Sequence, residues 1–217
     1  MTIVLLGGLW LDGSAWREVV PELERRGRTA VPVPPTGLTL TDQIDAVIAA
    51  VDAAPGPAVV VGHSAASALA WIAADRRPGK VAKVAMIGGF PSEDGKAYAD
   101  FFEIKDGVMP FPGWAPFEGP DAEDLGEEAR KEFEASAVAV PEGVARGVVR
   151  LTDDRRFDVP VVLVCPEFSP AQAREWVKDG DVPELARVKH LDYVDIDSGH
   201  WPMVTRPAEL AEILAAL

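Results

Sequence analysis

A strand-like apolar run passes directly into a tight turn in the segment Ala58-Val59-Val60-Val61-Gly62-His63-Ser64-Ala65-Ala66. The small apolar residues 58–61 are typical of a strand buried on both faces of a parallel sheet. The alanine-rich run that follows favours a helix up to Pro78-Gly79. Serine on such a strand-to-helix turn is the setting of a nucleophile elbow. A serine that only caps the helix is the competing interpretation.

The alternation of strand and helix extends outward from this segment in both directions. Predicted strands are short Val, Ile or Leu runs at Ile3–Leu6, Ala58–Val61, Val81–Ile87 and Val159–Val164, with weaker candidates at Thr29–Val33 and Leu191–Ile196. Predicted helices are Ser14–Arg26, Thr41–Ala53, Ala65–Arg77, Pro170–Lys178 and Pro207–Leu217. This order predicts an α/β fold with a mostly parallel central sheet and helices on both faces.

The alternation breaks between residues 90 and 150, a stretch rich in proline and aromatic residues. It is too long for a simple connection, and its apolar content argues against a disordered linker. We therefore expect a single domain over residues 1–217, with a cap segment inserted at about residues 90–150 above the carboxyl edge of the sheet. The acidic run at residues 121–128 is expected to form a solvated helix face.

Charge and composition exclude several classes of function. The 217 residues, 48% of them apolar, suffice for one α/β domain. A formal net charge of −14 disfavours nucleic acid and anionic membranes as partners, because both repel an acidic surface. No basic leader precedes the first apolar run, and no stretch approaches the roughly 18 apolar residues of a membrane span. We therefore expect a cytoplasmic monomer or homodimer that acts on a small molecule.

Neither a cofactor nor a metal ion is expected. Cys165 is the single cysteine, so the chain has no internal disulfide and no cysteine cluster for zinc. This residue is expected to be a small buried hydrophobe. The turn at Gly7-Gly8 lacks the spaced glycines and the lysine of a phosphate-binding loop.

A histidine follows the last predicted strand, in the segment Asp195-Ile196-Asp197-Ser198-Gly199-His200-Trp201-Pro202. Because the carboxyl ends of parallel strands share one edge, His200 is expected beside Ser64 and is the predicted general base. His63 adjoins the nucleophile and is expected to be structural, whereas His190 is expected at the surface.

The loop after the first strand is the predicted second half of an oxyanion hole. Its sequence is Gly7-Gly8-Leu9-Trp10-Leu11-Asp12-Gly13-Ser14-Ala15-Trp16, and its glycines allow the backbone to approach a ligand closely. We assign one donor to the Leu9 N–H, with Trp10 as its rival. The other donor is the Ala65 N–H, at the start of the helix after Ser64. A turn that simply needs glycine is the alternative.

These three segments together resemble the α/β-hydrolase superfamily, and within it the small methylesterase and hydroxynitrile-lyase group. The matching residues are 3–10 with 13–16, 61–65 and 198–203. The resemblance covers roughly residues 1–90 and 158–217 and does not extend through the cap segment. The family usually has His-Gly where this chain has Gly7-Gly8, a change that keeps the backbone donor and is expected to alter the rigidity of the loop.

The resemblance implies a triad acid after the strand that precedes the histidine strand. That turn is Cys165-Pro166-Glu167-Phe168-Ser169-Pro170, in which Glu167 is the only carboxylate. Glu167 would hold the His200 tautomer and stabilise the imidazolium. Other candidates for the acid are Asp94, Asp153 and Asp154, and an exposed loop carboxylate is a further interpretation of Glu167.

The predicted function is hydrolysis of a carboxylic ester or lactone of a small apolar or aromatic substrate through an acyl-enzyme. Trp10, Phe90, Trp114 and Trp201 are the candidate pocket residues, although core packing explains such aromatics equally well. One alternative is a lyase or cyclising acyl transferase on the same fold. Another is a ligand-binding or regulatory protein with little turnover.

Overall fold

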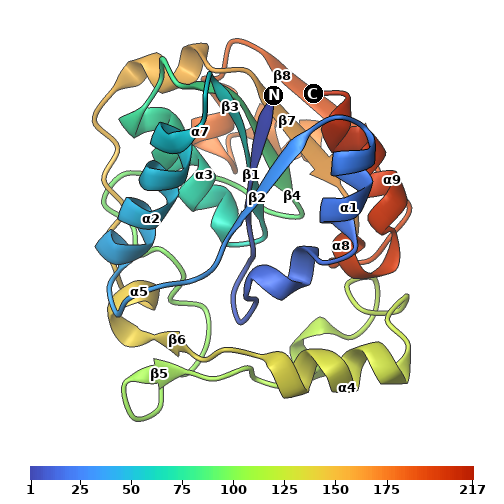
Figure 1. Ribbon diagram of the computed structural model, residues 1–217. Helices are drawn as coiled ribbons and strands as arrows, with labels where there is room; N and C mark the ends of the chain where they lie inside the picture. Colours follow the sequence, from blue (N-terminus) through green and yellow to red (C-terminus); the bar gives the residue numbers. More distant parts are fainter.

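The computed structural model describes residues 1–217 and is built around a six-stranded parallel sheet (Figure 1). Its strands are β1 (Thr2–Leu6), β2 (Thr29–Val33), β3 (Ala58–His63), β4 (Val81–Ile87), β7 (Val161–Cys165) and β8 (Leu191–Asp195). The spatial order is β2-β1-β3-β4-β7-β8, and every neighbouring pair is parallel. Strands β1, β3 and β7 are buried along their whole length, which explains their unbroken apolar sequences.

Helices cover both faces of this sheet, so the predicted fold class is confirmed. They are α1 (Val19–Arg25), α2 (Leu40–Ala53), α3 (Ala66–Arg76), α6 (Pro170–Asp179), α7 (Pro183–Ala186), α8 (Pro202–Thr205) and α9 (Pro207–Ala215). Figure 1 shows α2 and α3 on one face and α1 and α9 on the other. Reciprocal capping boxes fix the starts of two of them, Thr39 with Asp42 at α2 and Ser169 with Gln172 at α6.

The helix predicted over Ser14–Arg26 is instead two elements. A 3-10 helix, η1, spans Gly13–Trp16, and α1 begins only at Val19. The cap of η1 is Asp12, whose side chain accepts from the Ser14 N–H, so Ser14 is not the cap. Pro21 has no N–H to donate back into the preceding turn, which favours a new helix start there over a continuous helix.

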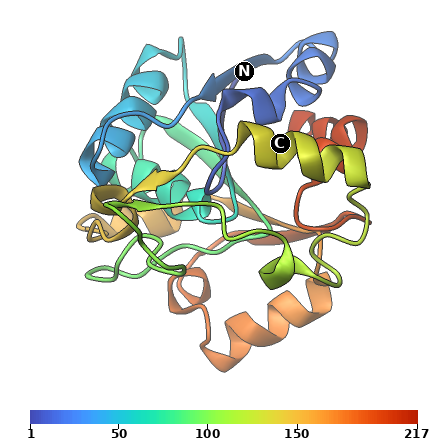
Figure 2. The ribbon, with the colours of Figure 1, turned by 90° about the horizontal axis from the view of Figure 1, so that it is seen from below.

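Residues 90–150 form short elements in the connection between β4 and β7. They are β5 (Val108–Met109), the 3-10 helix η2 (Ala115–Phe117), α4 (Glu127–Ser136), β6 (Val140–Pro141) and α5 (Glu142–Ala145). In Figure 1 these elements lie below the carboxyl ends of the strands. Figure 2, seen from below, shows this segment crossing that end of the sheet, with α4 beside the N-terminal loop.

A buried ion cluster lies at the opposite, amino-terminal edge of the sheet. The 3-10 helix η3 (Asp154–Asp158) precedes β7 and carries Arg156, which is only 4% exposed. The Arg156 guanidinium donates to both carboxylate oxygens of Glu184, at 3.0 and 3.3 Å, and lies 3.4 Å from Asp75 Oδ1 at the end of α3. Asp75 Oδ1 also accepts the N–H groups of Thr152 and Asp153, so the cluster ties η3 to α3.

None of the helices combines the length and the apolar content that crossing a bilayer requires.

Candidate active site

Ser64 lies on the sharp turn between β3 and α3. Its φ of +53° is in the left-handed region, which a non-glycine residue seldom adopts and which is a source of local strain. The Ser64 N–H donates to the Ile87 carbonyl at 2.8 Å, so the neighbouring β4 fixes this turn. Gly62 is required here, because a Cβ at that position would collide with the backbone of Ala66. Ala66 itself, where the family motif usually has glycine, is fully buried and accommodated.

His200 and Glu167 meet across two neighbouring loops. Strands β7 and β8 pair in register up to Cys165 and Asp195, and each is followed by one of the two loops. Glu167 Oε1 lies 2.8 Å from His200 Nδ1, and the side chains are 15% and 13% exposed. No hydrogen bond joins the His200 ring to the Ser64 hydroxyl; in substrate-free enzymes such contacts are often long and tighten when substrate binds.

The other three candidate acids serve structural purposes elsewhere. Asp94 Oδ1 accepts the Leu151 N–H at 3.0 Å. Asp153 accepts the Arg155 N–H at the start of η3 and pairs with the Arg155 guanidinium. Asp154 pairs with Arg156 and Arg187. Glu167 is therefore the one member of the candidate set that contacts His200.

His63 is buried directly behind the site. Its Nε2 lies 2.7 Å from the His200 carbonyl oxygen, which requires the ring to donate there. Burial, and to a lesser degree the neighbouring His200, hold the pKa of His63 well below its usual range. The ring is therefore neutral, and it connects the nucleophile turn to the histidine loop in a structural role.

A cavity of about 230 Å³ lies over these residues. It is lined by the polar residues His63, Ser64, Asp121, Glu167 and His200, and by Leu9, Trp10, Phe101, Phe102, Phe117 and Trp201. Ser64, Glu167 and His200 thus share one cavity. The predicted pocket residues Trp10 and Trp201 line it.

Phe90 and Trp114, also predicted for the pocket, do not line this cavity. Phe90 packs against Phe168 and Trp176, while Trp114 packs behind Trp201, with ring centroids 5.5 Å apart. Both rings pack in apolar surroundings outside the cavity. The position of an aromatic residue in the sequence does not show whether it lies in the core or in a pocket.

Sequence inspection missed Phe101, Phe102, Phe117 and Asp121 as cavity residues. The expectation of a solvated helix face for residues 121–128 is wrong at its start. Residues 121–124 form a turn, and only Glu127 and Glu128 enter α4. Asp121 and Asp124 are partly buried because the Asp121 carbonyl accepts the His200 N–H at 2.7 Å and Asp124 Oδ2 accepts the Gly199 N–H at 2.9 Å. An acidic run gives no sequence signal of such long-range contacts.

The loop after β1 passes directly against Ser64. A Cβ on Gly8 would lie 2.9 Å from the Cβ of Ser64, so only glycine allows this approach. The N–H groups of Leu9, Trp10 and Ala65 donate to no other backbone group. Unoccupied donors beside a nucleophile are the requirement for an oxyanion hole. The geometry keeps both Leu9 and Trp10 as candidates for the loop donor.

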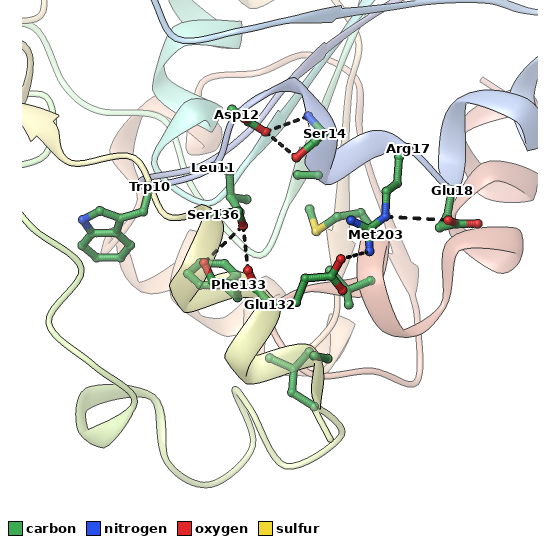
Figure 3. A pocket seen from close by; sticks show the side chains of 14 residues that line it. Trp10, Leu11, Asp12, Ser14, Arg17, Glu18, Glu132, Phe133, Ser136 and Met203 are labelled. Carbon is green, nitrogen blue, oxygen red and sulfur yellow. Dashed lines mark hydrogen bonds and ion pairs between the residues drawn. The ribbon is translucent and has the colours of Figure 1, made fainter. Parts of the chain in front are cut away.

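A second, smaller pocket of about 90 Å³ lies between η1, α4 and α8 (Figure 3). Its two hydroxyls are already engaged, Ser14 with Asp12 at 2.5 Å and Ser136 with the carbonyls of Glu132 and Phe133. An ion pair of 2.8 Å between Arg17 and Glu132 crosses it, as Figure 3 shows. No histidine lines this pocket, so its chemistry differs from that of the Ser64 cavity although Trp10 borders both.

The structure offers neither a cluster of metal ligands nor a reactive thiol. No three His, Cys, Asp or Glu side chains lie close enough together to hold a metal ion. Cys165 is fully buried at the end of β7, and burial raises the pKa of its thiol to about 12. The thiol is therefore protonated at neutral pH and packs as a small hydrophobe.

Comparison with known proteins places the chain among hydrolases. Residues 3–213 match the model of the alpha/beta hydrolase family. An extracellular alpha/beta-hydrolase from a Paenibacillus species has a similar structure, with a TM-score of 0.80 and 16% identity over 100% of this chain and 98% of that one. A methylesterase from Arabidopsis has a TM-score of 0.73 and 13% identity over 100% of this chain and 98% of its own. A pyrethroid hydrolase from Sphingobium faniae has a TM-score of 0.68 and 18% identity over 100% of this chain and 96% of its own. No curated protein matches in sequence.

Proposed function

This chain belongs to the alpha/beta hydrolase family, and on that premise we propose that it hydrolyses a small carboxylic ester or lactone. Ser64 is the nucleophile, His200 the general base and Glu167 the acid that orients it. The observation that carries the proposal is the 2.8 Å contact between Glu167 and His200 inside the cavity that Ser64 also lines. One structural neighbour is named as a methylesterase and another as a pyrethroid hydrolase, and these names support a hydrolytic reaction on an ester.

The reaction begins with proton transfer from Ser64 to His200. His200 Nε2 takes the hydroxyl proton while Ser64 Oγ attacks the carbonyl carbon, giving a tetrahedral oxyanion. The Glu167 contact places a proton on Nδ1, which leaves Nε2 free to act as the base, and its charge stabilises the imidazolium.

Collapse of this intermediate breaks the bond between carbon and the alcohol oxygen. The alcohol leaves with the proton held by His200, and the acyl group remains on Ser64. A water molecule then attacks the acyl carbon and gives its proton to His200. Return of that proton to Ser64 Oγ releases the carboxylic acid and restores the enzyme.

Two backbone donors stabilise the oxyanion in this proposal. One is the Ala65 N–H at the start of α3, where the helix dipole adds positive potential. The other comes from the loop after β1, from Leu9 or Trp10. The removal of one such donor typically lowers kcat by about 10²–10³-fold.

The first test is Ser64→Ala with a panel of neutral p-nitrophenyl esters. Loss of the nucleophile should reduce kcat by at least about 10³-fold, which leaves only catalysis by binding and oxyanion stabilisation. Ser136→Ala is the matched control, because this hydroxyl is bound to the carbonyls of α4 outside the Ser64 cavity. Undiminished hydrolysis by Ser64→Ala would overturn the proposal.

A second measurement separates ester hydrolysis from lyase chemistry on the same fold. Rapid mixing with a p-nitrophenyl ester should give a burst of p-nitrophenol, and mass spectrometry should find the acyl group on the peptide that contains Ser64. A lyase that uses Ser64 only for proton transfer forms no such adduct.

A further inference from the structure

Asp121 is a carboxylate in the catalytic cavity that the proposed mechanism does not use. Its side chain lines the cavity and takes part in no hydrogen bond or ion pair with the protein. No lysine or arginine lines the cavity, so the cavity holds no permanent cation beside this carboxylate. Burial raises the pKa of Asp121, the nearby Glu167 carboxylate raises it further, and His200 acts in the opposite direction.

The backbone of Asp121 is held in place by the histidine loop. Its carbonyl accepts the His200 N–H at 2.7 Å, and Asp124, three residues on, accepts the Gly199 N–H at 2.9 Å. These two bonds fix the turn that carries Asp121 against the active site. The backbone of Asp121 is thus a fixed part of the cavity wall, and the residue is half-buried, unlike the exposed Glu123 of the same turn.

Aromatic rings form much of the remaining wall. Trp10 and Trp201 are 5% and 3% exposed, and Phe117 contacts both, with ring centroids 6.0 and 5.4 Å away. The faces of such rings attract cations as well as apolar groups. A carboxylate among aromatic rings, with no cation of its own, matches an apolar group that carries a positive charge.

We infer that Asp121 determines the charge of the substrate. Esters whose cavity-bound group carries an alkylammonium are preferred over neutral esters of the same shape, and esters with a free carboxylate are rejected. The inference rests on the proposed ester hydrolysis at Ser64. It adds a specificity that the catalytic residues alone do not provide, because they act on the carbonyl group that all these esters share.

The test compares Asp121→Asn with wild type on matched esters. One pair varies the alcohol side, acetylcholine against 3,3-dimethylbutyl acetate. Another varies the acyl side, p-nitrophenyl 4-(trimethylammonio)butanoate against p-nitrophenyl 5,5-dimethylhexanoate, with mono-p-nitrophenyl glutarate as the anionic member. Asparagine keeps the shape of the side chain and the carbonyl that holds His200. Glu123→Gln is the control, because it removes one charge from the same turn outside the cavity.

In wild type, kcat/KM for the cationic member of at least one pair should exceed that of its neutral partner by about tenfold. Asp121→Asn should remove most of this preference through KM and relieve the rejection of the glutarate ester, so that the ratio of kcat/KM between cationic and neutral esters falls toward one. Glu123→Gln should keep the wild-type ratio. The inference is wrong if Asp121→Asn lowers kcat/KM by the same factor for all the esters. That result is expected if Asp121 only stabilises the His200 imidazolium.

A binding measurement keeps the inference testable if the chain turns over no ester. Quenching of tryptophan fluorescence should show that phenyltrimethylammonium binds wild type about tenfold more tightly than it binds Asp121→Asn. Benzoate should show the reverse order. Equal affinities in the two proteins would overturn the inference, while failure of ester hydrolysis alone would overturn only the proposed function.

Discussion

Carboxylates gather at both edges of the sheet, but only one of the two groups contains a cation. At the amino-terminal edge, Asp75 and Glu184 share the Arg156 guanidinium, and the Trp71 indole donates to Glu184 at 2.8 Å. At the carboxyl edge, Glu167 and Asp121 lie near each other with a histidine between the loops and no arginine or lysine in the cavity.

The difference separates stability from chemistry. A buried carboxylate that has a permanent cation is neutralised whatever happens around it, so it can tie elements together but cannot respond to a substrate. A carboxylate beside a histidine becomes fully paired only when the histidine is protonated, which is the step that catalysis requires. We therefore expect substitutions at the two edges to affect different measurements.

The largest effect is expected for Glu167→Gln. An amide donor in place of the carboxylate favours the wrong His200 tautomer, so kcat should fall by roughly 10²–10⁴-fold. The melting temperature should change little, because the contact is at the cavity surface. Ester hydrolysis and thermal unfolding of the same preparation measure both. Normal kcat in this variant would mean that Glu167 is only a loop carboxylate.

Arg156→Met should have the opposite profile. It leaves Asp75 and Glu184 buried without their cation, which typically costs about 3–5 kcal/mol of unfolding free energy. The kcat of the folded fraction should not change, because the cluster is at the far edge of the sheet. Urea denaturation measures the loss. Arg155→Met is the matched control, since Arg155 is 73% exposed and should contribute little. Equal losses in both variants would contradict a special role for the cluster.

His63 provides the smallest effect, a dependence of stability on pH at the catalytic edge. The unfolded chain protonates this imidazole below its ordinary pKa of 6.5, whereas the folded chain keeps it neutral. Unfolding therefore takes up a proton, and stability falls as the pH drops below about 6.5. Between pH 7 and 5 this one group can remove at most about 2 kcal/mol, the limit for an imidazole that stays neutral in the folded chain.

His63→Gln tests this dependence. Glutamine offers an N–H donor to the His200 carbonyl but does not titrate. Unfolding free energies measured across that pH range should therefore fall less steeply in His63→Gln than in wild type. Identical slopes in the two proteins would show that His63 is not the titrating group.

The loops that carry Ser64, Glu167 and His200 were predictable, because each follows a strand that can be identified from the local sequence. A buried strand followed by Gly62-His63-Ser64 predicts the strained turn, and the strand order then brings the loops of Glu167 and His200 together. Glu167 could be chosen because it is the only carboxylate in its turn.

Beyond Trp10 and Trp201, the cavity wall was not predictable, because it depends on contacts between segments far apart in sequence. Phe90, Trp114, Phe102 and Phe117 are all aromatic residues of the segment 90–150, and nothing in the sequence separates them. Of these, only Phe102 and Phe117 line the cavity. Asp121 is partly buried because its carbonyl accepts the N–H of His200, a residue 79 positions later in the chain. Periodicity and residue type contain no information on such contacts.

The bonds from Asp121 and Asp124 to the histidine loop have a consequence for protein engineering. Loops above the sheet of a hydrolase are natural targets for exchange between relatives, since they shape the pocket. In this chain the exchange of residues 118–126 would also remove the two acceptors that hold Gly199 and His200. A chimera that keeps the histidine loop in place must therefore supply two acceptors at the same places, which makes this turn part of the support of His200 and not a separable module.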